Sequence, residues 1–280
     1  MPDAAASPAA DRLTLLFDAD DTLWDNNVHF ERAILAWLDV VGGYGWTPEA
    51  ARAELDRIEE ANFTTGGVGT SAFAVHLRLA AQAIVPPDRL SEALARIDGI
   101  AAAMPRGAVT VFPGVVETLD TLGARHVLGL VTRGDPLEQW AKIDASGLRE
   151  RFAHIAVVEH KVAATYRDLV ARWGLDPSTT VMIGNSPRSD IVPARAAGLR
   201  AVLVSHASTW SLELAEVDPG DDGVAHVDRF ADLLALFGRR GLRRVRDASR
   251  EGDVKPRRAA DARAGRGTRA HRGRATAPGA

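Results

Sequence analysis

The sequence predicts an α/β protein, built as a doubly wound, Rossmann-like parallel sheet with an all-helical cap domain inserted into it. Over the second half of the chain, short apolar runs alternate with helical patterns, which is typical of a parallel sheet covered by helices. Between the first apolar run and Pro113 only helical periodicity remains. With 280 residues, of which 46% are hydrophobic, the chain is long enough for a buried core of this kind.

Five apolar runs, each bounded by polar residues or glycine, are predicted to be the buried strands of this sheet. The first run precedes the helical insertion and the other four follow it. The run at 155–158 is the weakest of the five. The predicted strands cover residues 13–17, 127–131, 155–158, 181–183 and 201–204.

Helical patterns fill the gaps between the later strands, and their ends carry the expected signals. Asp135 before Pro136 predicts an N-cap and a first turn. Gly147, Gly174 and Gly198 follow the last turns, where a left-handed residue is needed. The predicted core helices cover residues 114–122, 136–146, 164–173, 190–197 and 230–237.

The inserted segment has the pattern of a helical module. Its first helix shows apolar residues at helical spacing from Phe30 to Val41. Thr47 before Pro48 predicts the N-cap of the next helix. The further helices are predicted at residues 48–61, 71–84 and 89–104.

The end of the chain differs in composition from its body. Residues 239–280 hold 14 Lys and Arg against 4 Asp and Glu, and they contain no aromatic residue. Such a segment buries too little apolar surface to offset the entropy of ordering. We therefore expect disorder in residues 1–10 and 239–280, a core domain of residues 11–24 and 112–238, and a cap domain of residues 25–111. The tail is best interpreted as a solvated appendage, because binding to nucleic acid or an acidic partner would lack aromatic stacking platforms.

The composition excludes several kinds of site. The chain has no cysteine, so disulfides, thiolate metal sites and cysteine nucleophiles are excluded. No apolar run reaches the length of about 18 residues that a membrane-spanning helix needs, and the first residues lack the layout of a signal peptide. We expect a cytoplasmic protein without a membrane partner.

The strongest chemical signal is a carboxylate-rich turn directly after the first strand. Residues 17–23 read FDADDTL, which places Asp18, Asp20 and Asp21 together. This much negative charge calls for a cation, and Mg²⁺ is the hard ion that carboxylates prefer. Asp18 and Asp20 are two apart, so both can point to the same side of an extended backbone. One carboxylate can then attack while the other moves a proton; helix capping accounts for one of the three aspartates but not for all.

Polar residues also follow three of the later strands. Thr132 and Arg133 end the second strand, Lys161 follows the weakest one, and a loop carrying Asn185 and Asp190 follows the next. The carboxyl ends of parallel strands meet at one edge of a sheet, so these residues are expected to surround one site. The hydroxyl of Thr132 and the backbone N–H groups beside it can hold a phosphate oxygen.

In these residues the chain resembles the haloacid dehalogenase-like hydrolases, and in particular their phosphatase branch with a helical cap. Residues 17–23 resemble the first motif of that family, Thr132 the second, Lys161 the third and residues 184–190 the fourth. The segment at 139–148 is similar to the one that usually follows the second motif. The resemblance spans nearly the whole body of the chain.

The resemblance implies a hydrolase of phosphomonoesters that acts on a small phosphorylated metabolite. Asp18 would be the nucleophile that forms an aspartyl-phosphate, and Asp20 the general acid and base. Thr132 and Lys161 complete the catalytic set, and with Arg133 they would bind the substrate's phosphate. Dehalogenases of the family lack the second aspartate of the first motif, so Asp20 favours phosphate over halide.

The resemblance also implies Mg²⁺ as the cofactor. Asp18, Asp190 and the backbone carbonyl of Asp20 would help to bind it. Asn185 stands where many relatives carry aspartate, and its amide oxygen can ligate a hard cation but supplies no charge. Metal binding is therefore expected to depend more on the charge of Asp190 than on Asn185.

Several alternatives stay open. Lys142 is the rival for the catalytic lysine, and Lys161 is favoured because Lys142 falls inside a predicted helix. The loop at 64–70 is either a cover over the site or a plain linker. Sugar phosphates, nucleotides and flavin mononucleotide are all compatible substrates. A phosphomutase of the same family and a noncatalytic binding module that uses the basic tail are the alternative functions.

Overall fold

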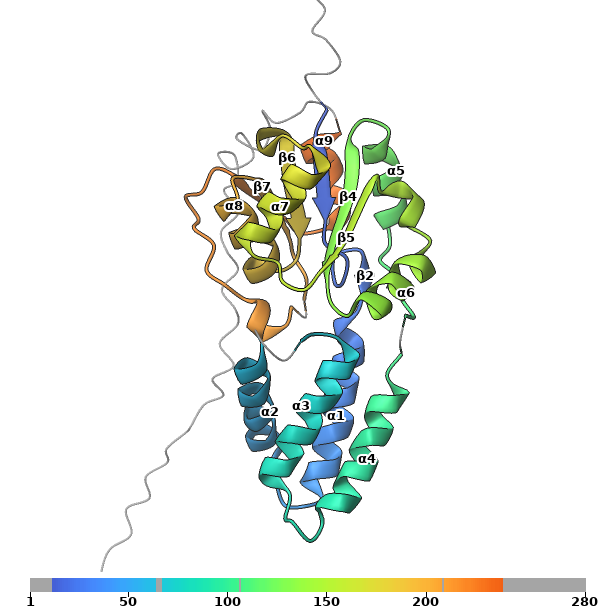
Figure 1. Cartoon of the computed structure of the whole chain (residues 1–280), viewed down its shortest axis with the longest axis vertical. Helices are drawn as coiled ribbons and strands as arrows, with labels where there is room; N and C mark the ends of the chain where they lie inside the picture. Colours follow the sequence, from blue (N-terminus) through green and yellow to red (C-terminus); the bar gives the residue numbers. More distant parts are fainter. Residues whose placement is uncertain (1–11, 64–66, 106, 208, 239–280) are drawn as a thin grey trace, which may run out of the picture.

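Strand β1 (Thr14–Phe17) lies inside a six-stranded parallel sheet, as its apolar sequence predicts (Figure 1). The computed structural model describes residues 12–63, 67–105, 107–207 and 209–238. The strand order is β5-β4-β1-β6-β7-β8, and all neighbouring strands are parallel. The other strands are β4 (Val127–Arg133), β5 (His154–Val158), β6 (Thr180–Gly184), β7 (Arg200–Val204) and β8 (Val224–Val227).

The sheet has one strand more than the sequence predicts. Strand β8 pairs only with β7, so it forms an edge of the sheet. Its side chains alternate between buried and exposed, and His226 faces solvent. An edge strand with this alternation lacks the continuous apolar run by which the other strands are predicted.

Five α-helices pack against the sheet at the predicted places. The capping signals are confirmed: the Asp135 side chain accepts the Glu138 N–H at 3.0 Å, and Gly147 and Gly174 adopt left-handed backbone angles. Two predicted helices begin differently, because a π-helical turn precedes α8 and a 3₁₀ turn precedes α9. The helices are α5 (Val115–Gly123), α6 (Pro136–Ser146), α7 (Ala163–Trp173), α8 (Val192–Ala196) and α9 (Leu233–Phe237).

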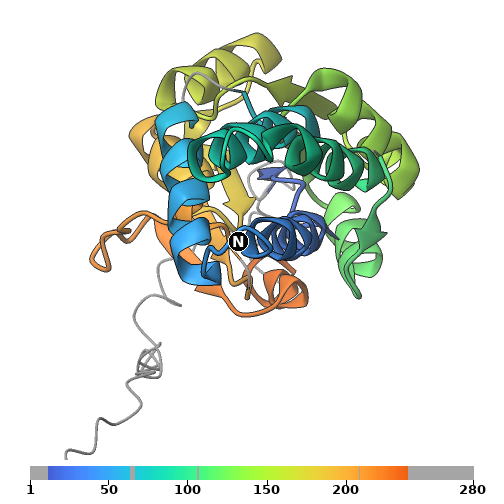
Figure 2. The same cartoon turned by 90° about the horizontal axis from the view of Figure 1, so that it is seen from below.

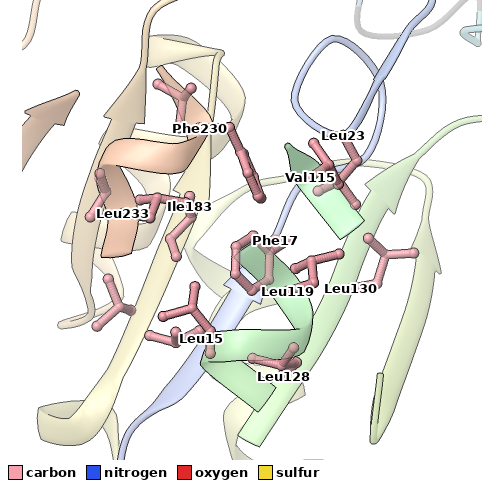
Figure 3. Packing of buried hydrophobic residues seen from close by; sticks show 14 of the residues in the cluster. Leu15, Phe17, Leu23, Val115, Leu119, Leu128, Leu130, Ile183, Phe230 and Leu233 are labelled. Atoms are coloured by element: carbon pink, nitrogen blue, oxygen red, sulfur yellow. The ribbon is translucent and has the colours of Figure 1, made fainter. Parts of the chain in front are cut away.

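Each face of the sheet has its own hydrophobic layer, because the side chains of β1 alternate between the faces. Leu15 and Phe17 are fully buried in the layer that α5 and α9 cover (Figure 3). Leu16 lies in the opposite layer, beneath α7 and α8. Burying side chains of this size stabilises the fold by about 1.5–3 kcal/mol each, which fixes β1 in the interior of the sheet.

The inserted segment forms a separate helical lobe, the cap, which lies across the carboxyl edge of the sheet (Figures 1 and 2). The cap has a hydrophobic core of its own, with Trp37 and Leu55 at its centre, both fully buried. Its helices are α1 (Asn27–Gly42), α2 (Pro48–Asn62), α3 (Thr70–Ile84) and α4 (Leu90–Ala103). Thr47 caps α2 as predicted, since its side chain accepts the backbone N–H of Ala50.

Where the chain enters and leaves the cap, a two-stranded antiparallel ribbon forms. It consists of β2 (Trp24–Asp25) and β3 (Thr110–Val111), and the sequence did not predict it. Two residues per strand are too few for a periodic signal. The division into core and cap domains at residues 25 and 111 stays a prediction, and both positions fall in this ribbon.

The predictions of disorder at residues 1–10 and 239–280 lie outside the described part of the chain. The prediction about binding partners of the basic tail also concerns residues outside the described part. Among the helices that the structure describes, none combines the length and the apolar character needed to cross a bilayer.

Candidate active site

A cavity of about 170 Å³ is lined by both lobes, at the carboxyl edge of the sheet. Strand β1 pairs with β4 on one side and β6 on the other, so the residues that follow these three strands meet there. All the site residues that the sequence predicts line this cavity: Asp18, Asp20, Thr132, Arg133, Lys161, Asn185 and Asp190.

The ammonium group of Lys161 lies between two buried carboxylates. Its Nζ donates to Asp18 Oδ1, and it donates to Asp190 Oδ1 at 2.7 Å. Burial raises the pKa of Asp18 despite the attraction of Lys161, and it raises the pKa of Asp190 to about 7. Burial by itself would lower the pKa of Lys161, but the two carboxylates outweigh it and the pKa is raised. The three groups are held as one charged cluster.

Asp20 is held by a different set of donors. Its Oδ1 accepts the indole N–H of Trp24 at 2.7 Å, and its Oδ2 accepts from Gln139 Nε2 at 2.9 Å and from Lys142 Nζ at 3.0 Å. Burial alone would raise the pKa of Asp20, but Lys142 and these hydrogen bonds outweigh it, and the pKa is lowered. Lys142 is thus the partner of Asp20, while Lys161 is the partner of Asp18.

The sequence interpretation named Lys142 as a rival for the catalytic lysine, but it did not predict that Gln139 and Lys142 are buried side by side on α6 and bind Asp20. One signal for them was present in the composition. Residues 12–238 contain only two lysines, Lys142 and Lys161, and basic residues elsewhere in this range are arginine. Both lysines line the cavity. A compact ammonium fits between carboxylates where the larger planar guanidinium does not.

Asp21 does not join the other two aspartates. It has a positive φ of 61°, and its Oδ1 accepts the backbone N–H groups of Asn26 and Asn27, both at 2.9 Å. Asp21 caps the start of α1, so it is the one aspartate of the turn for which helix capping accounts. Together with Asp25 and His206 it also belongs to a partly exposed group whose ligand atoms lie within 4.8 Å of one another.

Thr22 links the first strand end to the loop after β6. Its hydroxyl lies 3.0 Å from Asp18 Oδ2 and 3.1 Å from Asn185 Oδ1, and it accepts the backbone N–H of Asn185 at 3.1 Å. Gly184 leaves room for the neighbouring acid, since a Cβ there would lie 2.2 Å from Asp190 Oδ2. The loop thus brings one buried amide and one buried carboxylate to the side of Asp18.

These donors fit a hard divalent cation. Asp18, Asn185 and Asp190 offer only oxygen atoms, and all three side chains are buried. Two buried carboxylates face one ammonium here, which leaves a negative charge for a cation to balance. Oxygen ligands of this kind are those that Mg²⁺ takes in proteins.

Thr132 and Arg133 end β4 and line the cavity, but they differ in the contacts that they make. Thr132 is buried. The guanidinium of Arg133 pairs with Glu213 at 2.6 Å and lies over the ring of Phe63, 4.9 Å from its centre. Since its charge is already balanced, the predicted contact of Arg133 with a phosphate stays a prediction.

Glu213 comes from the 3₁₀ turn η5 (Ser211–Glu213), which the sequence interpretation did not include. It accepts the hydroxyls of Ser186 and Ser189 at 2.5 and 2.6 Å. Beside it, the ring of Trp210 packs on Phe63 of the cap, 5.6 Å between centres. This turn therefore braces the loop after β6 and contacts the cap.

A second contact between the lobes lies at the start of α3. Glu138 on α6 accepts the backbone N–H of Thr70 at 3.0 Å and its hydroxyl at 2.9 Å. Residues 67–69 line the cavity, which agrees with the loop being a cover over the site. Residues 64–66 of that loop lie outside the described residues.

Comparisons with known proteins agree with this geometry. A sequence model described as haloacid dehalogenase-like hydrolase matches residues 13–198. The glyceraldehyde 3-phosphate phosphatase of Methanothermobacter thermautotrophicus is 27% identical over 234 residues, which are 80% of this chain and 98% of that protein. A phosphoglycolate phosphatase of Haemophilus influenzae is 28% identical over 135 residues, 45% of this chain and 57% of that protein.

A solved structure gives the same result for the fold. The haloacid dehalogenase-like hydrolase of Xanthomonas campestris superposes with a TM-score of 0.68 at 26% identity, covering 80% of this chain and 94% of its own. The family model matches well over half of the chain. The protein belongs to the haloacid dehalogenase-like hydrolases.

Proposed function

We propose that the protein is a Mg²⁺-dependent phosphatase that hydrolyses a small phosphomonoester through an aspartyl-phosphate on Asp18. The observation that supports this most directly is the separation of the two aspartates after β1. Asp18 lies against Lys161 and Asp190, whereas Asp20 lies against Lys142. Two carboxylates in different surroundings can take different roles, one as nucleophile and one as acid and base.

In the first step, a carboxylate oxygen of Asp18 attacks phosphorus and the bond from phosphorus to the leaving oxygen breaks. Lys161 stabilises the charge on the transferring group, and Thr132 orients it. Asp20 gives its proton to the leaving oxygen, so the product alcohol departs neutral. The incoming phosphate is negative and raises the pKa of Asp20, which favours the protonated form that this step needs.

In the second step, Asp20 takes a proton from water, and the water oxygen attacks the phosphorus of the acyl phosphate. The bond between phosphorus and the Asp18 oxygen breaks, which releases inorganic phosphate and restores the carboxylate. The hydrogen bonds from Trp24, Gln139 and Lys142 favour the ionised form of Asp20, which is the form that takes the proton from water. Asp20 leaves this step protonated, as the first step of the next cycle requires.

Mg²⁺, when bound, supplies the positive charge that offsets the repulsion between a carboxylate nucleophile and a phosphate. Asp18, Asn185, Asp190 and the backbone carbonyl of Asp20 are the ligands we assign to it. The two relatives that are phosphatases support phosphate as the group transferred.

The proposal is tested by measuring inorganic phosphate release from a panel of phosphomonoesters, including p-nitrophenyl phosphate, with Mg²⁺ present. Turnover is expected with Mg²⁺, is expected to stop when the metal is chelated, and should return when Mg²⁺ is added back. Turnover that depends on a bisphosphate activator would indicate a phosphomutase instead. A folded protein that releases no phosphate from any member of the panel would contradict the proposal and favour a binding module.

A further inference from the structure

The wall of the cavity that the cap provides differs from the sheet edge. Four apolar side chains, Phe30, Ile34, Ala72 and Phe73, come from α1 and α3. Among them lie two titratable side chains, Glu59 on α2 and His76 on α3, which are only 4% and 6% exposed. Neither has a role in the reaction proposed above.

One oxygen of Glu59 has no hydrogen-bond partner. Glu59 lines the cavity, and its Oε2 is buried and accepts no hydrogen bond from any described residue. The Arg52 guanidinium is 3.6 Å from it, too long for a hydrogen bond, and the indole of Trp210 lies near the carboxylate. A buried acceptor without a donor is destabilising, unless a ligand supplies the donor.

His76 is the second polar group of this wall. No hydrogen bond of its ring is found among the described residues, and burial lowers its pKa, so the ring is neutral at pH 7. A neutral imidazole offers one donor and one acceptor. Glu59 and His76 together thus present acceptors and one donor, which is the complement of hydroxyl groups.

The charges around the cavity argue against a second anionic group on the substrate. Six carboxylates and three cations line it. Each of these cations already faces a carboxylate: Lys161 faces Asp18, Lys142 faces Asp20 and Arg133 faces Glu213. A carboxylate on the leaving group would therefore meet Glu59, and Arg52, the cation 3.6 Å from Glu59, does not line the cavity. Like charges in contact cost several kcal/mol.

The size of the cavity sets a further limit. Its volume of about 170 Å³ is below the ~300–1,000 Å³ that is typical of sites for drug-sized ligands. A leaving group of a few carbon atoms is compatible with this volume. This volume favours such a group over a nucleoside or a flavin.

We propose that Glu59 and His76 form the subsite for the leaving group, and that this subsite selects short, uncharged, hydroxyl-bearing phosphomonoesters over those that carry a carboxylate. The inference rests on the proposed phosphatase function and names its substrate class. Hydroxyl groups of the leaving group bind the Glu59 carboxylate and the His76 ring, and the apolar side chains pack on its carbon atoms.

The test compares glycerol 3-phosphate with 3-phosphoglycerate, which share a carbon chain and differ in a hydroxymethyl group against a carboxylate. For the wild-type protein we expect kcat/KM to favour glycerol 3-phosphate by about 100-fold or more. Glu59→Gln keeps the shape and removes the charge, so this preference should fall at least about tenfold, mainly through a gain on 3-phosphoglycerate. His76→Phe should lower kcat/KM for glycerol 3-phosphate about tenfold.

Glu60→Gln is the matched control, since Glu60 is the exposed neighbour on the same helix and its replacement should leave the preference unchanged. A wild-type preference for 3-phosphoglycerate, or a preference that Glu59→Gln does not alter, would overturn the subsite. The same holds if p-nitrophenyl phosphate is hydrolysed and neither three-carbon substrate is. Failure on all three substrates would instead overturn the phosphatase function itself, and the subsite with it.

Discussion

The two walls of the cavity treat buried charge in opposite ways. At the sheet edge, Lys161 bonds Asp18 and Asp190, and Lys142 bonds Asp20. On the cap wall, one oxygen of Glu59 is buried without a hydrogen bond from any described residue. Buried charge is therefore hydrogen-bonded to its counter-charge on the first wall, whereas on the second Glu59 Oε2 faces Arg52 at 3.6 Å without a hydrogen bond.

This difference has a physical consequence for function. Paired, hydrogen-bonded charges keep their geometry without a ligand, which suits groups that must be ready to react with any substrate. An unpaired buried acceptor gains most when a ligand supplies its donor, which suits a group that discriminates between substrates. The sheet edge should therefore set the rate on every substrate, and the cap wall should set the choice among them.

The largest expected effect is that of Asp18→Asn at the sheet edge. An amide cannot form the acyl phosphate, so phosphate release should fall by 10,000-fold or more, on the order of the loss seen when a catalytic nucleophile is removed. Asp168→Asn, at an exposed position of α7, is the matched control and should keep full activity. Measurable turnover by folded Asp18→Asn protein would mean that the nucleophile lies elsewhere.

Asp20→Asn should have the next largest effect. The amide can still accept from Trp24, but it cannot give or take the proton, so kcat should fall by roughly 100- to 10,000-fold. The preference for glycerol 3-phosphate over 3-phosphoglycerate should persist in the residual activity, because the cap wall is unchanged. A change of preference together with the loss of rate would show that the two walls are not separable.

Lys142→Met tests a residue that acts through Asp20 rather than on the substrate. The variant removes the ammonium group 3.0 Å from Asp20 Oδ2 and leaves the bonds from Trp24 and Gln139. We expect kcat to fall by about 10- to 100-fold with little change in KM. Arg172→Met, at an exposed position of α7, is the control. A rise in KM at constant kcat would instead place Lys142 in contact with the substrate.

Most of the fold could be predicted from the sequence because its strands and helices carry strong local signals. Buried parallel strands appear as apolar runs, and capping residues such as Asp135 and Gly147 mark the ends of helices. Strand β8 and the ribbon of β2 and β3 escaped prediction because partner strands, rather than local sequence, hold these short segments in place.

For the site, the sequence predicted which residues meet but not how their charges pair. Residues that follow strands β1, β4, β5 and β6 come together because of the topology of a parallel sheet. The pairing of Lys142 with Asp20 depends instead on contacts between α6 and the turn after β1, more than a hundred residues apart. Glu59 gives no signal at all in sequence, since a glutamate on a helix is ordinarily a solvated residue.

The smallest expected effect concerns the stability of the cap wall. Burial raises the pKa of Glu59 to about 7, with the Arg52 guanidinium opposing this shift and Asp56 adding to it. The folded protein then holds the Glu59 proton more tightly than the unfolded chain, so its stability falls as pH rises from about 4.5 to about 7 and levels off above that.

In the Glu59→Gln variant this side chain cannot ionise, so the variant should not lose stability in this way as the pH rises. Its melting temperature relative to wild type should therefore be higher at pH 8 than at pH 5, by about 4–8 °C for a difference of about 2 kcal/mol. Glu60→Gln, whose side chain is exposed, should show the same difference from wild type at both pH values. If the difference in melting temperature between Glu59→Gln and wild type is also the same at both pH values, the charge of Glu59 is balanced in the folded protein as fully as that of Asp20. The contrast between the two walls would then rest on shape and apolar contact alone, because the open charge on which selection against carboxylates depends would not exist.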